Sequence, residues 1–61
     1  MFFLVNERGE SLGKFRDKEA ALAALEELRH DAEYAGEWFA VVELDRHGNR
    51  VGEPIDELVS A

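Results

Sequence analysis

The sequence predicts an α+β fold in which a four-stranded antiparallel sheet, built in the order ββαββ, packs one long helix on one face. Strand-forming segments flank a glycine turn near the start, a helical periodicity follows, and a second pair of strand and turn signals comes last. A chain of 61 residues has room for one domain, residues 1–61. In that size range folding buries only about 60% of the surface of the unfolded chain.

The first sixteen residues are expected to form a β-hairpin. Residues 2–5 (FFLV) are rich in strand formers, and residues 12–15 bring the chain back. Between them, residues 7–10 include Gly9, which can adopt the positive φ of a tight turn.

A helix is predicted over residues 18–35. Asp17 can accept hydrogen bonds from free amides at its start, and Glu19 is favourable in its first turn. Gly36 is placed to end it in a left-handed conformation. The core-facing stripe is expected to contain Ala21, Leu25, Leu28, Ala32 and Ala35.

A second hairpin is expected after the helix. Residues 38–44 suit a third strand, residues 45–49 a turn, and residues 50–53 a short fourth strand. Pro54 lacks a backbone donor and should end that strand or lie on an edge of the sheet. Beyond it, residues 57–61 leave room for no more than a short C-terminal helical turn.

An internal match supports this order of elements. Shifting the chain by 39 residues lays residues 8–13 on residues 47–52, and Asp17 on Asp56. A complete ββα unit followed by a truncated one would explain the match. Three identities carry it, so coincidence stays open as the alternative.

Both faces of the predicted sheet carry apolar side chains, because successive residues of a strand point to opposite sides. In the first strand, Phe3 and Val5 point to one side, and Phe2 and Leu4 point to the other. In the third strand, one side carries Trp38, Ala40, Val42 and Leu44, and the other carries Phe39 and Val41. Either the C-terminal segment covers the second face or another chain does. We expect a protein-interaction module, a homodimer or a binder of another protein, with its interface at Phe2, Leu4, Trp38 and Phe39.

No catalytic, cofactor or metal site is predicted, and an enzyme is not expected. No motif surrounds the two serines, and a lone surface histidine needs no catalytic role. Glu26, His30 and Glu33 have the i, i+4, i+7 spacing of one helix face and could ligate a metal. A solvated face with Glu–Arg pairs explains the same spacing and is preferred. Without cysteine, the chain has neither a disulfide nor a thiolate zinc site.

The formal charge of −7 disfavours direct binding to nucleic acid or to an anionic membrane surface. The apolar run of residues 1–5 is too short for a membrane span or a signal-peptide core, so a cytoplasmic location is expected. The charge also motivates an alternative function. An acidic inhibitor, mimicking nucleic acid, could occupy a basic protein surface through Glu26, Glu27, Asp31, Glu33 and Glu37.

Two segments, residues 15–21 (FRDKEAA) and residues 42–51 (VELDRHGNRV), resemble small uncharacterised bacterial ββαββ proteins. In those proteins a hairpin leads into a helix that opens with an acid-lysine-x-Glu-Ala pattern. A second hairpin with a D-x-x-G-x-x-V turn follows. The resemblance spans most of the chain and implies the architecture only.

Overall fold

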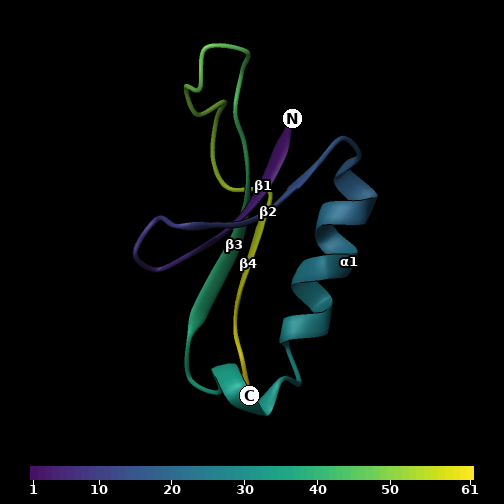
Figure 1. Cartoon of the computed structure of the whole chain (residues 1–61), viewed down its shortest axis with the longest axis vertical. Coiled ribbons are helices and arrows are strands. Elements are labelled where there is room, and N and C mark those ends of the chain that lie inside the picture. The colour runs from purple at the N-terminus through teal and green to yellow at the C-terminus, as the bar shows by residue number, and fades with distance from the viewer.

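The computed structural model describes residues 1–61 and confirms the α+β fold (Figure 1). One antiparallel sheet has the strand order β2-β1-β3-β4, so the two central strands come from the two halves of the chain. The elements in chain order are β1 (Phe2–Asn6), β2 (Ser11–Phe15), α1 (Lys18–Leu28), the 3-10 turn η1 (Ala32–Tyr34), β3 (Trp38–Glu43) and β4 (Asp56–Val59).

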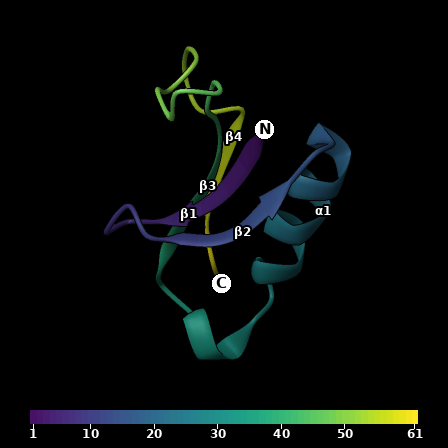
Figure 2. The same ribbon diagram turned by 45° about the horizontal axis from the view of Figure 1, so that its top comes forward.

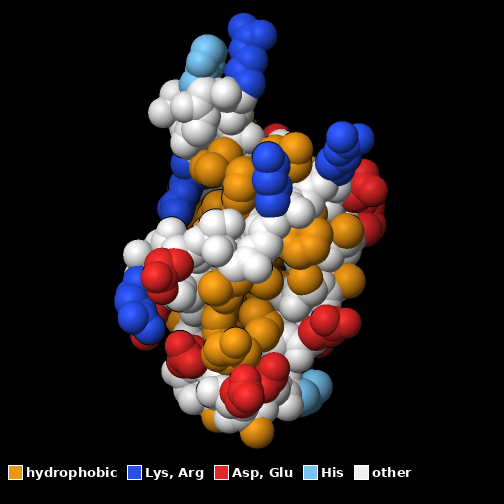
Figure 3. Space-filling view, viewed as in Figure 1, with side chains coloured by type: hydrophobic (Ala, Val, Ile, Leu, Met, Phe, Trp, Pro, Cys, Tyr) orange, Lys and Arg blue, Asp and Glu red, His pale blue; other side chains and the backbone are white.

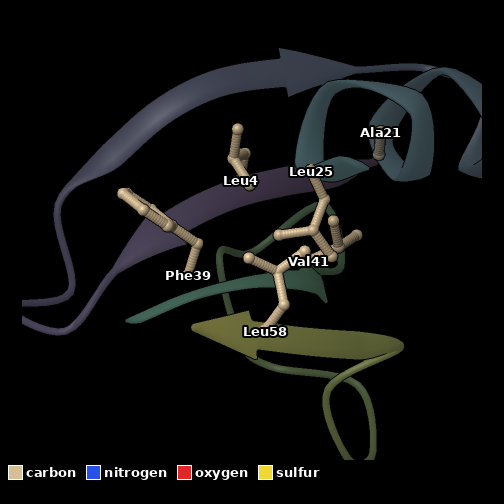
Figure 4. Packing of buried hydrophobic residues seen from close by; sticks show 6 residues of the cluster. All are labelled: Leu4, Ala21, Leu25, Phe39, Val41 and Leu58. Atoms are coloured by element: carbon tan, nitrogen blue, oxygen red, sulfur yellow. The ribbon is translucent and has the colours of Figure 1, made fainter. Parts of the chain in front are cut away.

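The main core lies between α1 and one face of the sheet. Ala21 and Leu25 are the fully buried residues of the helix, at the i, i+4 spacing that puts both on one side. They belong to one cluster with alternate residues of three strands, and in Figure 4 Leu25 lies beside Val41 and Leu58. The strand residues of this cluster are Leu4, Phe39, Val41 and Leu58.

The helix is shorter than predicted, because it ends at Leu28 and not near residue 35. The backbone N–H of Arg29 already donates to the carbonyl of Glu26, which tightens the last turn. Asp31 is extended and accepts a hydrogen bond from the Glu33 amide, so that a separate 3-10 turn begins there. Gly36 has the expected positive φ of 86°, but it follows this turn and not α1.

The hydroxyl of Ser60 accounts for the place where the helix stops. Ser60 is 3% exposed, and its Oγ donates to the carbonyl of Leu28 and lies 3.2 Å from that of Asp31. The amide of Ala61 donates to the carbonyl of Arg29. The carbonyl of Leu28 also accepts from the amide of Asp31, so the end of the chain and the local turn together satisfy the carbonyls at the helix end.

The fourth strand lies at Asp56–Val59, so the prediction of a strand over residues 50–53 was wrong. The predicted C-terminal helical turn was wrong too, because the same segment is a strand. Leu58 explains the choice: it pairs with Phe39 and is 8% exposed in the core, whereas Val51 is 43% exposed. Residue 50 keeps only an isolated bridge to Leu44. The segment that forms the strand is the one whose alternating pattern places a large apolar side chain in the core.

The internal match holds for the hairpin tips and fails beyond them. Asn6 and Asp45, 39 residues apart, build the same turn: each side-chain Oδ1 accepts from the amides two and four residues later. In each turn the glycine at the fourth position, with φ of 79° or 82°, donates to the carbonyl of the first. After the second turn the chain reaches β4 only at residue 56, so no second ββα unit forms.

The duplicated turn predicts matched effects of Gly9→Ala and Gly48→Ala. Neither added Cβ would meet a heavy atom within 4 Å, so the loss comes from the backbone conformation alone. We expect each variant to lose about 1–2 kcal/mol of unfolding free energy in urea denaturation. Gly9→Asn and Gly48→Asn are the controls and should lose less, because Asn tolerates positive φ. Equal losses for Ala and Asn would contradict this account.

Ser60→Ala should destabilise the fold by about 1 kcal/mol, because it removes a part-buried hydrogen bond and leaves the carbonyl of Leu28 with the amide of Asp31 as its donor. The measurement is urea unfolding followed by far-UV circular dichroism. Ser11→Ala is the matched control: that hydroxyl is exposed, and its removal should cost far less. A neutral Ser60→Ala variant would show that water replaces the hydroxyl at no cost.

Candidate interaction surface

The sheet face opposite α1 carries a second apolar cluster, which we call the open face. Its buried members are Val5, Ala40 and Val42, and the half-buried residues packed against them are Phe3, Trp38 and Leu44. All six come from the two central strands or from the residue that directly follows β3. Alternation produces this set, because each residue except Leu44 neighbours one that packs in the main core.

An antiparallel sheet with one helical layer normally turns polar side chains to its uncovered face. Here the only α-helix packs on the other face. The small Ala40 is fully buried, because the larger side chains of its own cluster lie around it. The β3–β4 loop extends beyond the strand ends and stands clear of the sheet in both ribbon views (Figures 1 and 2).

The two edges of the open face carry opposite charges. On β2, Lys14 pairs with Phe3 and so points to the same face. On β4, Glu57 pairs with Ala40, again on the open face. Both side chains are exposed, and neither takes part in an ion pair, since the two ion pairs of the chain are Arg8–Glu10 and Arg29–Glu26.

Val59 completes the face as its most exposed apolar residue. It pairs with Trp38 at the far end of β4 and is 59% exposed. Since β4 is an edge strand, this side chain lies at the rim of the apolar cluster. The open face therefore presents apolar surface to solvent and keeps its charges at the edges.

One end of the open face forms a pocket of about 310 Å³. It is lined by the apolar residues Met1, Phe3 and Leu44, by Lys14, and by the loop residues Asp45, Arg46 and Gly48. The Asp45 carboxylate is engaged in its own turn, where it accepts hydrogen bonds from the amides of residues 47 and 49. The pocket adjoins the apolar surface of the open face, since Phe3 and Leu44 belong to both.

The four residues expected at an interface do not share one surface. Phe2, Leu4 and Phe39 face the helix, and Leu4 and Phe39 are only 5% and 1% exposed. Trp38 alone lies on the open face. The sequence analysis separated the two alternating sets correctly but did not select Phe3, Val42 and Leu44 as surface candidates. No sequence signal could have selected them, because alternation does not tell which of the two apolar sets the helix covers.

The groups considered for chemistry do not converge. Because α1 ends at Leu28, Glu26, His30 and Glu33 do not lie on one continuous helix face. No three His, Asp or Glu side chains lie close enough together to hold a metal ion. Glu26 instead pairs with Arg29, at 2.6 Å between Oε1 and Nε, and this hydrogen bond lowers the pKa of the Glu26 carboxyl.

No family model, curated protein or solved structure matches the chain. Its helices are too short and too polar to cross a membrane.

Proposed function

We propose that the protein is a non-enzymatic interaction module that works as a homodimer, with the open face as its interface. The observation that carries this proposal is the second apolar cluster, which is built into the central strands and has no helix packed over it. A chain this small, without disulfides, gains from a partner that removes apolar surface from water. On the open face, a partner would cover the exposed Val59 and the half-buried Phe3, Trp38 and Leu44.

The size of the face sets the strength of association. Four strands of about five residues span roughly 19 Å by 17 Å, or about 300 Å² of flat footprint per copy. Side-chain relief increases this area, but the total stays at the low end for specific interfaces. We therefore expect a reversible dimer, with a dissociation constant on the order of micromolar, and not a permanent one.

Val59→Glu tests the interface with little risk to the fold, because Val59 is 59% exposed and lies outside both core clusters. In a dimer, the substitution places two carboxylates in an apolar contact. We expect the dissociation constant to rise about tenfold or more, measured by light scattering on a size-exclusion column over a series of protein concentrations.

Val51→Glu is the matched control, since Val51 is 43% exposed but lies in the β3–β4 loop. This variant should dimerise like the parent protein. A parent chain that stays monomeric at every concentration would refute the proposal. Equal weakening by the two substitutions would show that the interface is elsewhere.

A second candidate function is an acidic inhibitor that occupies a basic surface of another protein. The observation that favours it is a cluster of acids where α1 stops. In Figure 3 acidic side chains gather around that end, while most of the visible lysine and arginine side chains lie toward the β3–β4 loop. Its members are Glu26, Glu27, Asp31, Glu33 and Glu37, and the one arginine among them, Arg29, already pairs with Glu26.

This second function predicts that placement of charge matters as well as its total. Glu27→Lys with Glu33→Lys should weaken retention on a polylysine surface more than Glu7→Lys with Glu10→Lys, although both pairs change the net charge equally. Retention is measured as the salt concentration that elutes each variant. Equal elution of the two variants would show that binding follows net charge alone.

A further inference from the structure

We propose that the second copy packs on the open face about a two-fold axis that runs along the strands, so that Lys14 of each copy lies beside Glu57 of the other. This inference rests on the homodimer proposed above and adds its symmetry and its ion pairs. What points to it is the distribution of charge across the sheet.

Lys14 and Glu57 are the only charged residues that strand pairing places on the open face. The other charged strand residues, Glu43 and Asp56, pair with residues of the helix face. Lys14 lies on one edge strand and Glu57 on the other, three strand spacings or about 14 Å apart. Lys14 and Glu57 are therefore too far apart to form an ion pair with each other within one chain. Neither residue forms an ion pair with any other residue of the chain.

Two copies related by a two-fold axis can meet face to face in two ways that keep their strands aligned. An axis along the strands lays β2 of one copy over β4 of the other, and each Lys14 then faces a Glu57 on both flanks. An axis across the strands lays β2 over β2 and β4 over β4, and like charges then meet. The charge pattern favours the first arrangement.

The levels along the strands agree with this arrangement. Lys14 is level with Phe3 of β1. Glu57 is level with Ala40 of β3, and Ala40 pairs with Val5, which lies two residues beyond Phe3 in β1. The offset is about 7 Å, within reach of a lysine side chain. The same symmetry lays β1 over β3 of the other copy, so that Val5 comes over Ala40.

Charge reversal at one edge separates this geometry from general electrostatics. Glu57→Lys reduces the net charge from −7 to −5, so the general repulsion between copies falls and nonspecific effects would strengthen the dimer. In the proposed arrangement the substitution instead sets lysine against lysine on both flanks. We expect the dissociation constant to rise about tenfold in low salt, measured by sedimentation equilibrium.

Two further variants complete the test. Glu53→Lys makes the same change of net charge in the exposed β3–β4 loop, and its dimer should be no weaker than the parent dimer. Lys14→Glu combined with Glu57→Lys restores opposite charges on both flanks and should restore the parent affinity. A zero-length carbodiimide cross-link between Lys14 and Glu57, found between isotopically distinct copies by mass spectrometry, would place the two residues directly.

The outcomes distinguish the two proposals. A parent dimer that is unaffected or strengthened by Glu57→Lys overturns the axis along the strands and leaves the homodimer standing. A parent chain without a dimer overturns both. Weakening by Glu57→Lys that the double reversal does not repair also overturns the pairing, because the defect would then come from the lysine at position 57 itself.

Discussion

The structure depends on the attachment of the chain's last strand to the end of its only α-helix. Ser60 gives its hydroxyl to the carbonyl of Leu28, while its backbone exchanges hydrogen bonds with the turn before β3 through Gly36 and Glu37. This contact joins α1, η1, β3 and β4 at one point. Because it satisfies the helix terminus from outside, the helix can stop early and the chain can turn back into the sheet.

The early stop decides what covers each face. With 11 residues, α1 is about 16 Å long and covers one face of a small sheet. The C-terminal segment that might have covered the other face is instead used as β4, in the plane of the sheet. The chain has no other element to lay over Val5, Ala40 and Val42. The open face therefore follows from the same contacts that close the main core.

Local patterns could be predicted from the sequence, and long-range choices could not. The first hairpin, the apolar helix positions Ala21 and Leu25, and the repeated turn are each encoded within about ten residues. The end of α1 depends on Ser60, which is 32 residues from Leu28 in the sequence. Residues near 51 and 58 offer similar strand signals, and only packing against Phe39 selects Leu58. Alternation likewise yields two apolar sets without saying which one the helix will cover.

The charges at the sheet edges bear on why association would stop at two copies. Edge strands expose unpaired backbone groups, and a charged side chain there discourages another strand from adding. Lys14 and Glu57 lie on the two edge strands, yet both point to the open face. A face-to-face contact about one two-fold axis uses both residues in ion pairs and leaves no second apolar face exposed. The side chains that would align two copies would then also oppose growth into a longer sheet.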